Sequence, residues 1–241
     1  MSQPVTLSIV MPAYNEEEKI ADAISVTCDH LNGLGFEYEV VVVNDGSTDA
    51  TFNVASREAV KYDRRVKVVG YNRNAGKGHA LKYGFSYTSG EVITFLDCDM
   101  EINPNQIKRY IEAMKLGDLL IASKWHPESR VEMPFVRKIL SHGFNLLVKL
   151  LTGIKCYDTQ SGLKAFRRRV LEEVLPKMSV KRFAFDVELL TVANLYGFKV
   201  VELPISIRMR GLFSFREVCR MLWDILGITY RLRVLKWYDR R

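Results

Sequence analysis

The stretch EVITFLDCDMEINP, residues 91–104, joins a run of apolar residues to two acidic residues separated by one position. The run EVITFL is typical of a buried strand. Because side chains alternate along an extended chain, Asp97 and Asp99 are expected to lie on the same side and to converge on one ion. Mg²⁺ or Mn²⁺ suits such a pair, since proteins hold these ions with one or two carboxylates and leave other positions to water and substrate phosphates. For a D-x-D pair taken alone, an exposed turn rich in Asp is the alternative.

Around this stretch, short β-rich runs alternate with stretches of helical periodicity. The expected strands are VTLSIVMPA (5–13), YEVVVV (38–43), VKVVGY (66–71), EVITFL (91–96) and DLLIAS (118–123). Such alternation predicts a mostly parallel sheet covered by helices, in which ligands bind at the carboxyl ends of the strands. Asp97 and Asp99 stand at such an end.

The pattern changes after residue 125. A polar loop leads into a basic amphipathic helix at about 134–151, the segment YDTQSGLKAF (157–166), a helix at about 185–197, a strand at 198–206 and a basic, aromatic-rich tail from about Ser214. We expect one domain over residues 1–211, which includes the amphipathic helix, and a basic amphipathic C-terminal segment over residues 212–241.

Composition limits the class of protein. The 241 residues are 48% hydrophobic and 26% charged, which is ordinary for a folded domain. The four cysteines form no C-x-x-C, so we expect neither a disulfide framework nor a zinc site, and we expect the cytoplasm as the compartment. No signal peptide and no apolar run of spanning length is found. The net charge of +7 indicates an acidic partner: nucleic acid, an anionic membrane surface or a phosphorylated substrate.

Three further motifs stand at the expected strand ends: PAYNEEE (12–18), NDGSTD (44–49) and NRNAGKGHAL (72–81). NDGSTD can be a turn and helix cap, and Asp45 can in addition accept the N–H of a nucleobase. Lys77 and its glycines at a helix start suit a phosphate, with a simple helix cap as the alternative. Neither a Walker loop nor a G-x-G-x-x-G motif follows the first strand, which argues against a dinucleotide cofactor.

Taken together and in this order, PAYNEE, VVNDGSTD, NAGKGHAL and FLDCDM resemble glycosyltransferase family 2. The resemblance continues through DTQSGLKAF, RFAFDVELL and ELPI, which look like the polyprenyl-phosphate sugar synthases, especially the dolichyl-phosphate glucose and mannose synthases. It covers residues 5 to about 210. It implies an α/β fold of the GT-A (Rossmann-like) type, with a mixed, mostly parallel sheet flanked by helices, amphipathic interface helices and an amphipathic C-terminal tail.

The resemblance also implies a reaction. An inverting hexosyltransferase moves the sugar of a nucleotide sugar to the phosphate of dolichol or another polyprenol and releases the nucleoside diphosphate. UDP-glucose is the expected donor, because QSGLKAF and FDVELL look more like the glucose synthases, and GDP-mannose is the main alternative. A non-catalytic basic binding protein of the same fold is the alternative from another class. A processive polysaccharide synthase is disfavoured, because its Q-x-x-R-W signature is missing.

Roles carried over from the family fall into three groups. Mg²⁺ or Mn²⁺ would be held by Asp97, Asp99 and Glu101. The nucleotide sugar would be bound by Pro12, Ala13, Tyr14, Glu16, Asp45, Lys77, Asp97, Gln160 and Ser161. The acceptor phosphate would meet Lys124, Arg137 and Arg210, and Asp186 would face the sugar or acceptor; Asp97, Asp99, Lys124, Arg137 and Asp186 form the expected catalytic set. Without the family context, a solvated basic surface explains these cations.

This chain departs from the family at three positions. Asn44 stands where the family often has a second Asp, Glu101 where mannose synthases commonly have Gln, and Lys124 where they have Arg. Lys124 keeps the charge but loses the bidentate fork of a guanidinium. A lipid phosphate is already anionic near neutral pH, so the reaction needs no carboxylate base.

The tail predicts contact with a membrane. Its apolar helical stripe consists of Phe215, Val218, Leu222, Ile225 and Leu226, and Trp223, Tyr230, Trp237 and Tyr238 are side chains suited to a lipid interface. With the helix at 134–151, this predicts a peripheral protein on the cytoplasmic face of a membrane, and a membrane-anchored protein partner is a further candidate. The alternative is that the stripe packs on the protein's own core. No nucleic-acid motif accompanies the basic residues, so nucleic acid is not expected as a partner.

Overall fold

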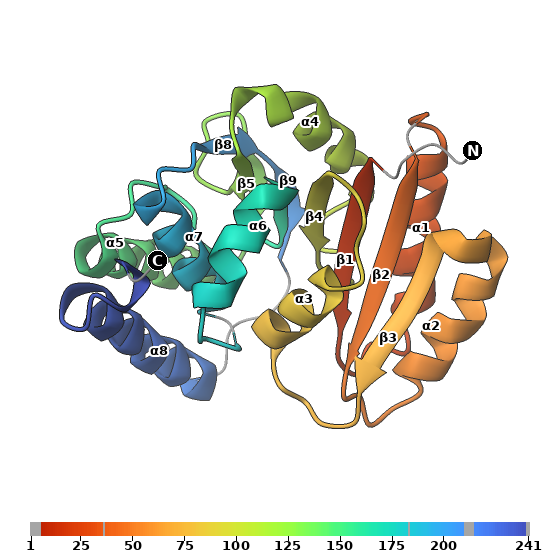
Figure 1. The fold of residues 1–241 in the computed structure, drawn as a ribbon, viewed down its shortest axis with the longest axis horizontal. Coiled ribbons are helices and arrows are strands. Elements are labelled where there is room, and N and C mark those ends of the chain that lie inside the picture. The colour runs from red at the N-terminus through yellow and green to blue at the C-terminus, as the bar shows by residue number, and fades with distance from the viewer. Residues whose placement is uncertain (1–5, 36, 183, 210–214, 240–241) are drawn as a thin grey trace.

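The computed structural model of the chain describes residues 6–35, 37–182, 184–209 and 215–239. Within these residues, seven strands form one sheet in the order β3-β2-β1-β4-β7-β5-β8 (Figure 1). β1 (Leu7–Ala13), β2 (Tyr38–Asp45), β3 (Val66–Tyr71) and β4 (Val92–Leu96) are parallel to one another. β2 is buried along its whole length, as expected for a parallel strand covered on both faces. The expected mixed, mostly parallel sheet is confirmed.

The second part of the sheet contains a strand that the sequence did not indicate. β7 (Leu163–Arg167) lies between β4 and β5 (Leu119–Ser123) and is antiparallel to both, whereas β8 (Val200–Pro204) is parallel to β5. The run LKAFR was missed because Lys164 interrupts its apolar residues, yet Lys164 is itself buried. β6 (Arg130–Glu132) and β9 (Ser206–Arg208) pair separately.

Helices cover both faces of the sheet and build two apolar cores. α1 (Ile20–Asn32), α2 (Thr51–Ala59) and α4 (Ile107–Glu112) belong to one core. α3 (Lys77–Phe85), α6 (Arg168–Val174) and α7 (Phe185–Leu195) belong to the other. α5 (Phe135–Thr152) and α8 (Phe215–Arg233) lie side by side beyond α7 (Figure 1). The 3-10 helices are η1 (Val60–Arg65), η2 (Pro104–Gln106), η3 (Ala113–Leu116), η4 (Leu175–Lys177) and η5 (Trp237–Asp239).

The extended geometry expected for the D-x-D segment is wrong. β4 ends at Leu96, and after Asp97 the chain turns at Cys98 and Asp99 and bends at Met100, which has the left-handed φ of 61°. Alternation along a strand therefore does not bring Asp97 and Asp99 together. The turn places Asp97 and Asp99 together instead, and both residues line the same two cavities described below.

The C-terminal segment packs on the domain; the boundary expected at residue 211 lies outside the described residues and stays a prediction. Met221, Ile225 and Ile228 of α8 are buried, and so is Tyr238 of η5. Ile225 and Tyr238 were expected at a lipid interface, but they contribute to the core shared with α6 and α7. Among the described helices, none combines the length and the apolar character that crossing a bilayer requires.

Candidate active site

A cavity of about 380 Å³, here called the main cavity, opens at the carboxyl ends of β1, β2 and β4. This is the edge at which open α/β sheets bind ligands. The sequence-predicted donor residues that line it are Pro12, Ala13, Tyr14, Glu16, Asp45, Lys77 and Asp97, together with Asp99. Motifs from four strand ends therefore meet in one place. Arg182, Arg220, Met221 and Asp224 also line the main cavity, and the sequence analysis assigned no role in the site to them.

A smaller cavity of about 150 Å³ adjoins the main one. Both are lined by Lys77, Asp97, Asp99 and Met221, so the acidic pair lies at their junction. The other predicted residues that line the smaller cavity are Glu101, Lys124, Arg137, Gln160 and Asp186. Ser161 lines neither cavity; its hydroxyl is buried and has no hydrogen-bond partner within the described residues. Arg210 lies outside the described residues.

The first two strand-end motifs are bound to each other. The backbone N–H of Asn15 donates to Ser47 Oγ at 3.0 Å, and Asn15 Oδ1 accepts from the backbone of Thr48 at 2.9 Å. The N–H of Glu16 donates to Thr51 Oγ1 at 2.8 Å. Ser47 and Thr48 of NDGSTD, with Thr51, thus fix the loop of PAYNEEE, and Glu16 and Asp45 line the same cavity. The helix cap expected of NDGSTD is wrong, because α2 begins after Ala50 without a side-chain cap.

Asp45 holds the loop before α3. Its carboxylate accepts hydrogen bonds from the Tyr71 hydroxyl at 2.7 Å, from the Asn74 side chain at 3.1 Å and from the N–H of Ala75 at 2.8 Å. The N–H of Gly76 donates to it as well, at 3.0 Å. The contact of Asp45 with a nucleobase stays a prediction. Such a contact would come in addition to the role of Asp45 in holding the loop before α3.

Lys77, Asp97 and Asp99 form the centre of the site. Lys77 Nζ lies 2.7 Å from the Asp97 carboxylate. Burial opposes the positive charge of Lys77, but the carboxylates of Asp97, Asp186 and Asp99 outweigh it and raise its pKa. Burial and then the negative charge of Asp97 raise the pKa of Asp99 to about 6. The carboxylates of Asp97 and Asp99 therefore lie close together in a partly buried cavity, where they repel each other. A bound cation would reduce this repulsion.

The carboxylates fit a hard divalent ion. Over residues 6–35, 37–182, 184–209 and 215–239, no group of three Asp, Glu, His or Cys side chains is arranged to hold a metal. Asp97 and Asp99 thus offer an incomplete set of oxygen ligands, which is the usual protein share for Mg²⁺ or Mn²⁺ beside a diphosphate. Glu101 instead has its carboxylate 3.8 Å from Arg137 Nη1, and its role as a ligand stays a prediction.

Lys164 and Asp186 form a buried ion pair that only the structure reveals in full. Lys164 Nζ lies 2.9 Å from Asp186 Oδ1 and also donates to the carbonyl of Ser161. Burial lowers the pKa of Lys164, and the Asp186 carboxylate opposes this change. Asp186 was expected in the site; Lys164 was not. The signal for Lys164 was a single cation within an otherwise apolar run.

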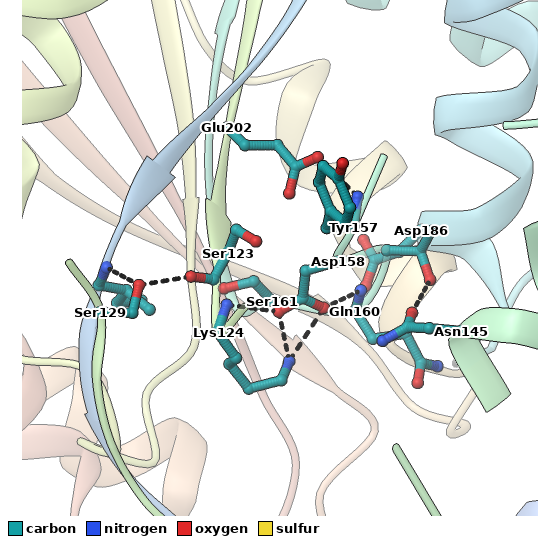
Figure 2. A network of polar contacts seen from close by, with 12 residues as sticks. Ser123, Lys124, Ser129, Asn145, Tyr157, Asp158, Gln160, Ser161, Asp186 and Glu202 are labelled. Carbon is teal, nitrogen blue, oxygen red and sulfur yellow. Dashed lines mark hydrogen bonds and ion pairs between the residues drawn. The ribbon is translucent and has the colours of Figure 1, made fainter. Parts of the chain in front are cut away.

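Lys124 is paired inside the protein. Figure 2 shows its ammonium directed at Asp158, 2.8 Å from Oδ2, and the backbone N–H of Lys124 donates to the same carboxylate at 2.9 Å. Asp158 also accepts from the N–H of Gln160 at 3.1 Å. Asp158 is 1% exposed, and sequence reasoning missed it. Its carboxylate neutralises Lys124, and Arg137, whose Nη1 lies 3.8 Å from the Glu101 carboxylate, is the other predicted cation of the smaller cavity.

The model of the family described as glycosyl transferase family 2 matches residues 8–175. The chain belongs to glycosyltransferase family 2. The match includes every strand end that lines the main cavity and ends just after β7 and α6.

Curated relatives of this family 2 chain extend over nearly its whole length. The dolichyl-phosphate beta-glucosyltransferase of Drosophila melanogaster is 34% identical over an alignment of 254 positions, which covers 98% of this chain and 78% of that protein. The human dolichyl-phosphate beta-glucosyltransferase is 31% identical over an alignment of 252 positions, which covers 96% of this chain and 77% of that protein. The glycosyltransferase AglD of Haloferax volcanii is 29% identical over 244 residues; the match covers 98% of this chain but only 39% of AglD.

Solved structures share the fold. The glucosyl-3-phosphoglycerate synthase of Mycobacterium tuberculosis, in complex with Mn²⁺, UDP and glucosyl-3-phosphoglycerate, aligns with a TM-score of 0.70 at 20% identity. The alignment covers 94% of this chain and 79% of that one. The same synthase with Mn²⁺, UDP-glucose and phosphoglyceric acid also gives 0.70. The likeness confirms the GT-A fold of the family 2 chain.

Proposed function

We propose that this family 2 glycosyltransferase moves glucose from UDP-glucose to the phosphate of dolichol or a similar polyprenol. The observation that carries the proposal is the position of Lys77, Asp97 and Asp99, which line both cavities at once. A nucleotide sugar in the main cavity and a phosphate in the smaller one would meet at these residues. The names of the relatives that are 31% and 34% identical support glucose and a dolichyl acceptor.

The donor would lie along the motifs of β1 and β2. Pro12, Ala13 and Tyr14 offer apolar and aromatic surface for a base, and Asp45 stands beside them. Asp97 and Asp99 would hold Mg²⁺ or Mn²⁺, which when bound offsets the negative charge that grows on the departing diphosphate. Complexes of the mycobacterial synthase with Mn²⁺ and UDP-glucose support a divalent ion and a uridine donor. Gln160 would contact the donor sugar.

The acceptor phosphate would enter the smaller cavity, where Arg137 supplies positive charge. A phosphate oxygen attacks the anomeric carbon, the bond from that carbon to the diphosphate breaks, and its electron pair leaves on UDP with inversion. The phosphate is anionic near neutral pH, so no base has to remove a proton. What the chain supplies is position: Asp186 is fixed by Lys164, and Lys124 by Asp158.

Transfer assays test this reaction directly. Vesicles that contain dolichyl or polyprenyl phosphate are given labelled UDP-glucose or GDP-mannose with Mg²⁺ or Mn²⁺. We expect a glucosyl phosphoryl lipid from UDP-glucose and little product from GDP-mannose. Product from GDP-mannose alone would replace the donor in the proposal. No turnover with either donor, in protein that binds nucleotides, would favour a non-catalytic binding protein.

We further propose that α5 and α8 hold the enzyme at an anionic lipid surface. These adjacent helices and the residues after α8 expose many apolar side chains, namely Phe135, Val136, Ile139, Leu140, Leu146 and Leu150, and then Trp223, Leu226, Tyr230, Val234, Leu235 and Trp237. Exposed cations from the same segments are Lys138, Arg216, Arg233 and Lys236. Aromatic and apolar side chains bordered by cations suit the interface of anionic lipids. The cytoplasmic face and a membrane-anchored partner stay predictions.

Substitution of the outward face of α8 tests this contact better than truncation, because truncation also removes buried Met221, Ile225 and Ile228. Trp223→Ser with Leu226→Ser should weaken sedimentation with anionic liposomes severalfold and leave the melting temperature nearly unchanged. Val60→Ser is the matched control, because Val60 of η1 is 80% exposed. Equal liposome binding by the double variant and the control would refute the contact.

A further inference from the structure

α8 supplies a wall of the main cavity in addition to its outward apolar face. Arg220, Met221 and Asp224 line the main cavity, and Met221 also lines the smaller one. Positions four apart lie on one face of a helix, so Arg220 and Asp224 are presented together. Trp223 and Leu226 of the same helix are exposed. One helix therefore faces both the candidate donor site and solvent.

The acidic residues at the strand ends do not supply the positive charge that a bound diphosphate requires. The acidic residues of the main cavity are Glu16, Asp45, Asp97 and Asp99 at the strand ends and Asp224 of α8, and the nearby Lys77 is already paired with Asp97. A nucleoside diphosphate brings further negative charge into this space. A single divalent ion on the Asp pair leaves several negative charges close together, so additional cations are needed where the phosphates lie.

Arg182 and Arg220 are the remaining cations of the cavity lining. Neither guanidinium makes a hydrogen bond or an ion pair within the described part of the chain. Burial raises the pKa of the Asp224 carboxyl, and the positive charges of Arg231 and then Arg182 oppose that rise.

The loop that carries Arg182 is fixed beside the phosphate-type loop before α3. The N–H of His79 donates to the carbonyl of Lys181 at 3.0 Å. A Cβ at Gly76 would lie 2.7 Å from that carbonyl and 2.8 Å from Arg182 Cγ, so only glycine permits this approach. Gly76 also has a φ of 100°, which favours glycine independently. Arg182 is thus held next to the residue that precedes Lys77.

We propose that Arg220 of α8, together with Arg182, binds the diphosphate of the nucleotide sugar. The inference rests on the proposed function and adds a donor-binding role for the C-terminal helix. Guanidinium groups bind phosphate oxygens through strong charge-assisted hydrogen bonds. The donor diphosphate is favoured over the acceptor phosphate because both arginines line the main cavity with Asp45 and neither lines the smaller one.

Calorimetry with uridine, UMP and UDP, in the presence of Mn²⁺, tests the role of each arginine. Arg220→Ala and Arg182→Ala should each weaken UDP binding about tenfold, the loss typical of one charge-assisted hydrogen bond. Uridine binding should not change, because it has no phosphate. Arg220→Lys should recover part of the UDP affinity. Arg216→Ala is the matched control, since it removes the same charge from an exposed position of the same helix that lines neither cavity.

The outcomes separate this inference from the proposed function. UDP affinity that is the same in Arg220→Ala and Arg216→Ala, with a wild type that binds UDP, refutes only the role of Arg220. Equal losses for uridine and UDP would show a displaced helix and would also refute it. Loss of polyprenyl phosphate binding with UDP binding intact would assign the arginines to the acceptor and overturn the inference. A wild type that binds neither UDP nor GDP refutes the proposed function itself.

Discussion

Glu188 of α7 accepts a hydrogen bond of 2.6 Å from the hydroxyl of Tyr238, a residue 50 positions further along the chain. Glu188 is fully buried, and it also accepts from the backbone of Val180 at 2.7 Å and pairs with Arg231 at 3.3 Å. A buried carboxylate needs such partners. Glu188 therefore joins the C-terminal segment to the domain that bears the candidate site.

Removal of the Tyr238 hydroxyl should destabilise the fold without unfolding it. Tyr238→Phe loses the hydrogen bond to Glu188 and the one that the hydroxyl accepts from Arg231 Nε at 3.1 Å. Glu188 keeps its other partners, so we expect a loss of about 1.5 to 3 kcal/mol in the free energy of unfolding. Urea denaturation measures this change. Tyr230→Phe is the control, since that side chain is 54% exposed, and it should change stability by less than about 0.5 kcal/mol. Similar values for the two variants would contradict the role of this contact.

Asp45 should matter more than any single partner of its carboxylate. Asp45→Ala removes the acceptor shared by Tyr71, Asn74, Ala75 and Gly76, so it should lower UDP affinity and loosen the loop before α3. Tyr71→Phe removes one of these bonds and should keep most of the affinity. Calorimetry with UDP and the melting temperature are the measurements. Equal UDP affinity in Asp45→Ala and wild type would leave Asp45 with a structural role alone.

The sequence predicted the arrangement of the first half of the chain because local patterns determine it. Apolar runs such as those of β2 and β3 end in turn residues, and parallel strands bring those ends to one edge. The position of β7 could not be predicted in this way. Its antiparallel pairing with β4 and β5 depends on residues far apart along the chain.

Buried charges were missed for a related reason. Asp158 and Lys124 are 34 positions apart, and nothing local to either residue indicates the other. The apolar period of α8 was visible, but a period shows only that one face is apolar. It does not say whether that face meets lipid or protein, and in the structure Ile225 meets the core whereas Leu226 is exposed.

Transfer should depend on a divalent ion and on both carboxylates of the D-x-D turn. Asp97→Asn or Asp99→Asn should lower turnover at least about a hundredfold, because each removes charge stabilisation that is needed as the diphosphate departs. Chelation of the wild type with EDTA should do the same, and added Mg²⁺ or Mn²⁺ should restore activity. The melting temperature reports on folding. Full activity in excess EDTA would contradict this prediction.

Gly162 should be required for the position of Asp97. A Cβ at residue 162 would collide with Asp97 Oδ2 and would lie 3.1 Å from its Cγ. The Asp97 carboxylate is also paired with Lys77, 2.7 Å away, so a movement away from the Cβ would disturb that ion pair. Gly162→Ala should therefore lower turnover and UDP affinity measured with Mn²⁺ by about tenfold or more, since small displacements of reacting groups cost much of the rate.

The matched control is Gly143→Ala in α5, where a Cβ meets nothing within 4 Å. Alanine is the better helix former by roughly 1 kcal/mol, so this variant should keep full activity and melt at or above the wild-type temperature. Far-UV circular dichroism should show both variants folded. If Gly162→Ala instead transfers glucose at the wild-type rate, the close approach of Gly162 does not set the position of Asp97. If it loses activity only in proportion to a lower melting temperature, the glycine supports the fold rather than the carboxylate.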